Sequence, residues 1–212
     1  MKTSISACVL IASSAAAFTP STVQRSSTSL KAFSAEDLPG AIAPVGFFDP
    51  LGFAEKADEN TMKRYREAEL THGRVAMLAV LGFLAGEKVE GASFLFDAQV
   101  TGPAITHIPQ VGLPFWATLL LSISAAEQLR ARKGWVDPAD TPVDQPGLLR
   151  ADYTPGDLGF DPLGLKPEDP EEFRIMQTKE LQNGRLAMIA AAGFLAQEAV
   201  DGKGIIEHLQ SM

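Results

Sequence analysis

Cysteine is almost absent from this chain of 212 residues: the one present is Cys8. It lies in an N-terminal segment typical of a cleaved leader, so the mature protein is expected to have neither a disulfide nor a thiolate metal site. Histidine is scarce too, with three in the chain and no H-E-x-x-H motif, whereas a catalytic metal site needs three converging ligands. No nucleophile, base and oxyanion set is evident either. These absences favour a binding protein over an enzyme.

Basic residues are outnumbered by acidic ones, 18 against 26. Loss of residues 1–31 would remove three basic residues and no acidic one, which gives a mature net charge of −11. Nucleic acid is therefore excluded as a partner, because phosphate binding needs a basic surface.

Acidic residues are missing altogether from the first 31 positions. Residues 1–17 combine Lys2 with an apolar run that ends in three alanines, as a signal peptide does, and the Ser/Thr-rich residues 18–31 are typical of a plastid transit segment. The two in series resemble the presequence of plastids that are wrapped in extra membranes. An ordinary secreted protein is the alternative. Residues 32–212 are expected to form one domain.

A clean apolar run of about 20 residues, the usual sign of a transmembrane helix, is missing as well. Apolar residues instead concentrate at about 62–90, 113–131 and 173–200, and the first and third stretches contain charged residues. We expect an all-α membrane protein with three transmembrane helices. The outer two would exceed a hydrocarbon layer of roughly 30 Å, so they should tilt or protrude.

Basic residues are distributed unevenly around these spans. They lie before the first span and between the second and third, whereas Lys88 is the one between the first two spans and Lys203 the one after the third. The positive-inside bias then places the N-terminus on the stromal side and the C-terminus on the lumenal side of a plastid membrane.

An internal repeat is the most informative feature present. Residues 69–91 and 180–202 align at a constant offset of 111 with 14 identities in 23 positions, and each copy follows a loop that contains FDPLG. The duplicated unit is therefore a loop plus a helix, and the middle span has no counterpart. We expect the first and third helices to cross about a pseudo-two-fold axis.

Charged residues in the repeated helices need partners, because an unpaired charge at membrane depth costs about 2.5 kcal/mol or more. Glu69 and Arg74 are five residues apart, and so are Glu180 and Arg185, which points each pair to different sides of its own helix. A crossing would instead pair Glu69 with Arg185, and Glu180 with Arg74. Small residues at matched positions suit a close approach, or are merely tolerated in lipid. They are Gly73, Ala76, Ala79 and Gly82 in the first helix and Gly184, Ala187, Ala190 and Gly193 in the third.

Uncharged Lewis bases accompany these carboxylates. His72 and Asn183 lie three residues beyond Glu69 and Glu180, on the same helix faces. Gln197 follows Asn183 at a distance of about 21 Å along the helix axis. Such oxygen and nitrogen atoms suit single axial ligation of a magnesium ion that four macrocycle nitrogens already hold. For His72, an interhelical hydrogen bond is the alternative.

The motifs ELTHGRVAM at 69–77 and ELQNGRLAM at 180–188, with the two FDPLG loops, closely resemble the light-harvesting chlorophyll-binding superfamily over residues 33–212. The presequence and the sparse middle loop are similar to its chlorophyll a/c branch, which carries fucoxanthin or a related xanthophyll. The resemblance implies a thylakoid antenna that binds chlorophyll a, chlorophyll c and such a xanthophyll, and transfers excitation energy to a photosystem. The implied partners are a photosystem core, other antenna subunits and thylakoid lipids, and oligomers are compatible with it.

The same resemblance implies particular roles for residues of the repeat. The chlorophyll-ligand positions are Glu69, His72, Glu180, Asn183 and Gln197. Arg74 and Arg185 complete the crossed ion pairs.

The middle span and the C-terminus carry further candidates. Residues 127–130 match the family's E-x-x-R, which makes Glu127 a ligand paired with Arg130, and Gln128 its substitute. A plain helix-end salt bridge is the alternative. Another family ligand position falls near the apolar Leu119, which leaves that pigment site in doubt. His208 is either a ligand on a short amphipathic lumenal helix or a surface histidine.

Other functions remain open at this point. The FDPLG loops can cover the ends of carotenoid grooves, or Asp49 and Asp161 simply form turns. A photoprotective relative would sense lumenal acid through residues such as Glu87, Glu90, Asp97, Asp201 and Glu207. A pigment-poor thylakoid assembly protein should lack several ligands, and this chain retains them on all three spans.

Overall fold

The computed structural model describes residues 38–44, 46–88, 100–143 and 145–211. The chain divides into residues 1–32 and 33–212, and all described residues belong to the second unit. The leader and transit segments expected at 1–17 and 18–31 lie outside the described residues. The second unit contains α1 (Phe53–Lys56), α2 (Glu59–Gly86), the 3-10 helix η3 (Ala104–His107), α3 (Leu113–Gly134), α4 (Pro170–Asp201) and α5 (Ile205–Ser211).

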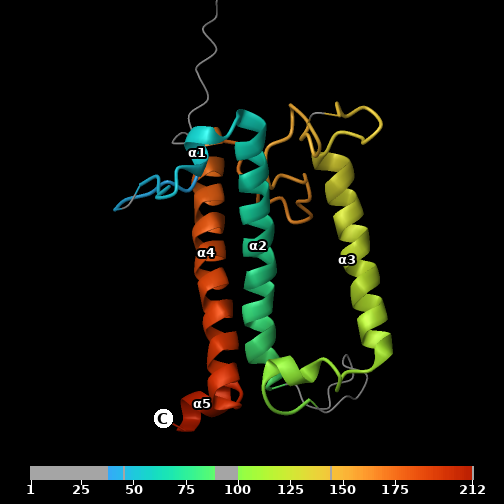
Figure 1. Ribbon diagram of the computed structural model, residues 1–212, viewed down its shortest axis with the longest axis vertical. Helices are drawn as coiled ribbons and strands as arrows, with labels where there is room; N and C mark the ends of the chain where they lie inside the picture. The colour runs from blue at the N-terminus through green and yellow to red at the C-terminus, as the bar shows by residue number, and fades with distance from the viewer. Residues whose placement is uncertain (1–37, 45, 89–99, 144, 212) are drawn as a thin grey trace, which may run out of the picture. The chain divides into compact units, whose positions relative to one another are not determined.

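Helices α2 and α4 lie side by side along their length, whereas α3 stands apart from both (Figure 1). The N-termini of α2 and α4 share one end of the unit with the C-terminus of α3, here called the FDPLG end (Figure 1). The opposite end, which carries η3 and α5, is the α5 end. Among the described helices, α2 is the one long and apolar enough to cross a membrane by length and composition.

Both repeated helices begin with the same kind of cap. Asp58 accepts a hydrogen bond from the Thr61 backbone N–H at 3.2 Å, and Asp169 accepts one from the Glu172 N–H at 3.1 Å. A capping carboxylate satisfies N–H groups that the first helical turn leaves unpaired. Helix α2 therefore begins at Glu59 and α4 at Pro170, each three residues before the span expected from the sequence, which starts at 62 or 173. Helix α2 also ends at Gly86, ahead of residue 90, while α3 continues beyond residue 131 to Gly134.

The contact between α2 and α4 is closest near the middle of both helices. There Gly73 and Gly184 face each other, and a Cβ on either would lie 3.0 Å from the Cα of the other. Further along, Gly82 and Gly193 have no atom within 4 Å of such a Cβ, so they take no part in a close approach. In that region the rings of Phe83 and Phe194 meet edge to face with centroids 6.2 Å apart.

Two glutamates connect the helices at the α5 end. Glu87, just after α2, accepts hydrogen bonds from the backbone N–H groups of Ile205 at 2.5 Å and Ile206 at 2.9 Å. Glu198 of α4, 111 positions later, accepts one from the Ala104 N–H at 2.9 Å. Each repeated helix thus caps the short helix that follows the other one. Neither cap was evident from the sequence.

Helix α3 is anchored at its two ends. Its N-terminal end packs Phe115 and Trp116 against Val100 and Val111. At its C-terminal end Gly134 lies under the ring of Tyr153, which a Cβ at that position would meet at 3.1 Å. Between these ends its large apolar side chains are exposed, including Leu120 at 62% and Leu121 at 73%. Exposed apolar surface of this extent marks a site of interaction with a membrane or with another protein.

Candidate functional site

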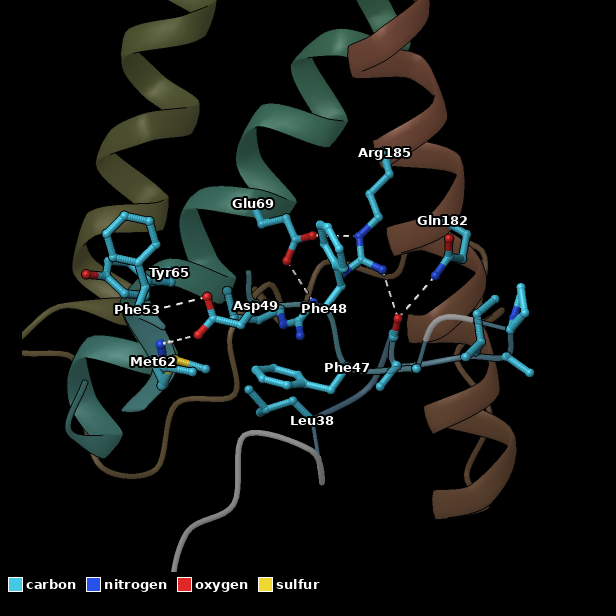
Figure 2. Close-up of a pocket in the computed structure, with 18 residues that line it drawn as sticks. Leu38, Phe47, Phe48, Asp49, Phe53, Met62, Tyr65, Glu69, Gln182 and Arg185 are labelled. Atoms are coloured by element: carbon cyan, nitrogen blue, oxygen red, sulfur yellow. Dashed lines mark hydrogen bonds and ion pairs between the residues drawn. The ribbon is translucent and has the colours of Figure 1, made fainter. Parts of the chain in front are cut away.

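Two ion pairs join α2 to α4 near their crossing. Arg74 Nε lies 2.7 Å from Glu180 Oε1, and Arg185 Nε lies 2.7 Å from Glu69 Oε1. The structure therefore brings together the partners that the repeat pairs by symmetry. All four side chains are about one third exposed. Figure 2 shows the pair formed by Glu69 and Arg185 at the rim of a cavity.

Each arginine also binds the loop that precedes an FDPLG motif. Arg74 donates a hydrogen bond to the Gly156 carbonyl at 2.8 Å, and Arg185 donates one to the Gly40 carbonyl at 2.8 Å. Both glycines have positive φ, 83° and 103°. A Cβ at Gly156 would lie 2.6 Å from Leu70 Cδ1, so the loop can lie on the helix only without a side chain there. The ion pairs thus hold both loops against the helices.

The two ion pairs differ in one respect. Glu69 Oε2 accepts a second charged hydrogen bond, from Arg66 at 2.8 Å. The position that matches Arg66 in the repeat is Gln177, and within the described part of the chain no hydrogen bond to Glu180 Oε2 is formed. Glu180 therefore keeps one carboxylate oxygen available for a ligand, whereas Glu69 shares both oxygens with arginines.

His72 and Asn183 are exposed on the outer faces of the two helices and are anchored in the same way. His72 Nδ1 lies 2.7 Å from the Ala68 carbonyl, and Asn183 Nδ2 lies 2.9 Å from the Lys179 carbonyl. A carbonyl only accepts, so Nδ1 of His72 carries the proton and Nε2 keeps its lone pair. Asn183 likewise presents its Oδ1. Each helix offers one fixed Lewis base toward its surroundings.

Gln197 and His208 converge on one carboxylate at the α5 end. Asp201 Oδ2 accepts a hydrogen bond from the Gln197 amide, and His208 Nδ1 lies 2.6 Å from the same oxygen. In the neutral form of His208 with its proton on Nδ1, Nε2 is a Lewis base, and Gln197 presents Oε1. The sequence placed these two ligand candidates on separate sites, but the structure makes them neighbours.

Glu127 and Arg130 form the expected pair on α3. Arg130 donates from Nε at 2.9 Å and from a terminal nitrogen at 2.6 Å, both to Glu127 Oε2, so Oε1 of Glu127 stays available. Gln128 is exposed beside them. The sequence did not point to Glu67, which is 2% exposed and binds Arg130 from α2 at 3.1 Å. Burial and this carboxylate raise the pKa of the neighbouring Tyr153 to about 12.

The FDPLG loops share a turn built on their aspartates. Asp49 accepts backbone hydrogen bonds from Phe53 at 3.1 Å and Ala54 at 2.6 Å. Asp161 does the same with Leu165 at 3.0 Å and Lys166 at 2.8 Å. These bonds lower the pKa of both carboxyl groups. Asp49 and Asp161 therefore both stabilise turns.

Two cavities flank the ion pairs at the FDPLG end. The one in Figure 2 has a volume of about 650 Å³ and adjoins Glu69 and Arg185. Its walls carry the aromatic side chains Phe47, Phe48 and Tyr65. The other, of about 530 Å³, adjoins Arg74 and Glu180. Both can accept the end group of an elongated apolar molecule.

The donor atoms do not form a cluster. In the described ranges no group of three or more His, Cys, Asp or Glu side chains could hold a bare metal ion. Single oxygen or nitrogen donors facing outward instead suit a metal whose other positions are filled by a macrocycle. Long helices with exposed apolar faces and such isolated donors define the class of helical membrane proteins that bind tetrapyrroles.

Comparison with known proteins agrees with this class. Residues 34–199 match the chlorophyll A-B binding protein family, and the chain belongs to that family. It is a light-harvesting pigment-binding protein and not an enzyme.

Named relatives include proteins of several kinds. The chain is 54% identical over 177 residues to light-harvesting complex stress-related protein 3.2, chloroplastic, of Chlamydomonas reinhardtii, covering 82% of this chain and 67% of that protein. It is 55% identical over 167 residues to the fucoxanthin-chlorophyll a-c binding protein of Isochrysis galbana, covering 78% and 77%. With chlorophyll a-b binding protein 1B-21 of Hordeum vulgare the identity is 37% over 172 residues, covering 76% and 63%.

Proposed function

We propose that this protein is an antenna of the plastid thylakoid that crosses the membrane three times, through α2, α3 and α4. Helices α2 and α4 are related by a pseudo-two-fold axis through their crossing, and α5 is a lumenal helix at the membrane surface. The reciprocal ion pairs of Glu69 with Arg185 and Glu180 with Arg74 support the axis. The N-terminus is stromal and the C-terminus lumenal, as the distribution of basic residues favours.

The charged residues of α4 are compatible with its insertion into a membrane. Its 32 residues extend over about 48 Å, so its ends protrude from a hydrocarbon layer of roughly 30 Å or the helix tilts. Near its middle, Glu180 and Arg185 are neutralised by α2, which removes most of the cost of two unpaired charges in lipid.

Chlorophyll is bound one molecule to one outward donor. The single observation that carries this assignment is the matched anchoring of His72 and Asn183 by the carbonyl four residues earlier, which leaves Nε2 of His72 and Oδ1 of Asn183 for magnesium. Glu69 binds arginines through both oxygens and ligates through a further lone pair of one of them. The remaining ligands are likewise oriented by hydrogen bonds or ion pairs. They are Glu127 with Gln128 as its substitute, Glu180, Gln197 and His208.

The pigments are chlorophyll a, chlorophyll c and fucoxanthin or a related xanthophyll. The relative from Isochrysis galbana, named for fucoxanthin and chlorophylls a and c, supports this set. Xanthophyll end groups occupy the two cavities beside the ion pairs, where aromatic walls and charged rims match an apolar chain with a polar end. Energy passes to a photosystem core, directly or through other antenna subunits.

Dissipation of excess excitation is a second candidate. It is favoured by the identity of 54% to stress-related proteins of Chlamydomonas reinhardtii. Of the acidic residues that would sense the lumen, Glu87 holds α5 and Asp201 holds Gln197 and His208. Glu90 and Asp97 lie outside the described residues.

The test is purification of the native pigment–protein in mild detergent, with pigment analysis by chromatography and fluorescence lifetimes at pH 7.5 and pH 5. Harvesting predicts a long lifetime at both pH values, and dissipation predicts a short one at pH 5. Reconstitution of His72→Phe and Asn183→Leu should each remove one chlorophyll per protein. Full pigment content in both variants would reject the ligand assignment.

A further inference from the structure

Glu67 is the most buried charged side chain among the described residues, at 2% exposure, and no pigment ligand role falls to it. Its Oε1 accepts a hydrogen bond from Arg130 of α3 at 3.1 Å. Its Oε2 accepts one from the Tyr153 hydroxyl at 2.9 Å and one from the Gly156 N–H at 2.7 Å. One carboxylate of α2 therefore joins α3 to the segment that precedes α4. A buried carboxylate that is this fully bonded is held rigidly.

Arg130 connects this carboxylate to Glu127. One terminal nitrogen donates to Glu67 and to Thr71 Oγ1, both at 3.1 Å, while its other two donors go to Glu127 Oε2. Glu127 itself is half exposed, and within the described residues its carboxylate has Arg130 as its hydrogen-bond donor. The direction of Glu127 Oε1 is thus set by an arginine whose other end is fixed on α2.

In the described part of the chain, the other repeated helix forms no equivalent link. The position that matches Glu67 is Thr178, whose hydroxyl donates to the Arg174 carbonyl of its own helix. Along the middle of α3, the large leucine side chains are exposed. The polar contact through Glu67 therefore joins α2 to α3 at the FDPLG end.

We propose that Glu67 is a positioning residue for chlorophyll: acting through Arg130, it sets the orientation of the chlorophyll on Glu127 relative to the chlorophylls on α2. The inference rests on the proposed function, because it needs a chlorophyll at Glu127. Excitation transfer between two pigments depends on the angle between their transition dipoles. A residue that fixes one helix against the other therefore controls the coupling of the pigments that the helices carry.

The experiment uses the full chain reconstituted with its pigments, in four forms: wild type, Glu67→Gln, Glu127→Ala and the double variant. Glu67→Gln preserves shape but removes the charge that holds Arg130. We expect Glu127→Ala to lose one chlorophyll, and Glu67→Gln to retain that chlorophyll about 10-fold more weakly, as when the hydrogen-bond partner of a metal ligand is lost. The visible circular dichroism of Glu67→Gln should change, and this change should vanish in the Glu127→Ala background.

A matched control is Glu198→Gln, which alters a glutamate that is buried to the same extent at the α5 end. It should leave the Glu127 chlorophyll and its dichroism unchanged. If Glu67→Gln fails to fold, Arg130→Lys keeps the charge but loses the fork that spans both carboxylates, and should reproduce the spectral change.

Two results would overturn the proposal in distinguishable ways. Loss of no chlorophyll in Glu127→Ala, and of none after Gln128→Ala is added to it, would remove the ligand assignment and the positioning role with it. Loss of one chlorophyll in Glu127→Ala, together with an unchanged spectrum in Glu67→Gln or a spectral change that persists in the double variant, would reject the positioning role and leave the ligand in place.

Discussion

Gly73 of α2 and Gly184 of α4 lie in backbone contact where the two helices cross. A Cβ added to either residue would be 3.0 Å from the other's Cα. Glu69 and Arg74 lie within about one turn of Gly73, as Glu180 and Arg185 do of Gly184. The glycine contact therefore brings the two helices close enough for both ion pairs to form, each with an N···O distance of 2.7 Å.

Substitution of Gly73 by alanine should push the helices apart. We expect Gly73→Ala to destabilise the pigment–protein by about 1–3 kcal/mol, as overpacking of a close contact does. The measurement is the thermal loss of energy transfer from carotenoid to chlorophyll. Gly82→Ala is the control, because nothing lies within 4 Å of its added Cβ. Equal melting of the two variants would show that the contact is not needed.

Charge reversal should distinguish the two ion pairs by the stability that each double variant recovers. Arg74→Glu alone and Arg185→Glu alone should each prevent stable folding, since two carboxylates would then face each other. Adding Glu180→Arg to the first should recover about 0.5–3 kcal/mol of coupling energy in a double-mutant cycle. Adding Glu69→Arg to the second should recover less, because Arg66 then faces a new arginine.

Thermal stability and chlorophyll content after reconstitution report this result. A double variant no more stable than its worse single variant would mean that the paired residues do not meet. Equal recovery of stability in the two double variants would mean that the charge of Arg66 has no effect on the residue at position 69.

Removal of Glu69 should be more damaging than removal of His72. Glu69→Ala leaves Arg185 and Arg66 without their carboxylate partner, and breaking a buried pair costs up to about 3–5 kcal/mol, less here because the pair is partly exposed. His72→Ala removes a ligand but no charge. The yield of refolded pigment–protein compares the two. An equal or better yield for Glu69→Ala would contradict the crossed pairing.

Alkaline pH should loosen the protein through Tyr153. Its pKa is raised from 10.0 to about 12, so the folded state holds the phenolic proton more tightly than the unfolded state. The stability it contributes is complete below about pH 10 and is lost as the pH rises toward 12. Tyr153→Phe should melt with a weaker pH dependence between pH 9 and pH 11. A wild-type melting temperature that stays constant over this range would contradict the linkage.

Much of the arrangement around the crossing follows from the repeat. Because residues 69–91 and 180–202 are copies, any contact that one helix makes with the other is expected twice, at an offset of 111. That expectation selects the partners of Glu69 and Glu180 without coordinates. The structure adds two features at the same offset, the caps at Asp58 and Asp169 within each helix and the ring pair of Phe83 and Phe194.

Ligand roles remain proposals, but the structure limits them. The sequence could place His72 and Asn183 on helix faces, yet it could not say which atom of each is free, since that depends on the carbonyl each side chain binds. Nor could it show that Gln197 and His208 share Asp201, because that contact depends on how α5 lies against the end of α4.

Sequence by itself determined the repeated helices, the signs and partners of the charges at their crossing and the turns of the FDPLG loops, because all of these depend on local spacing and on the duplication. Tertiary structure alone decided the role of Glu67. Its partners Arg130, Tyr153 and Gly156 lie 63, 86 and 89 positions away, and its counterpart in the repeat is a threonine. A contact without local periodicity or an internal copy exists only after α3 and the segment before α4 have packed against α2.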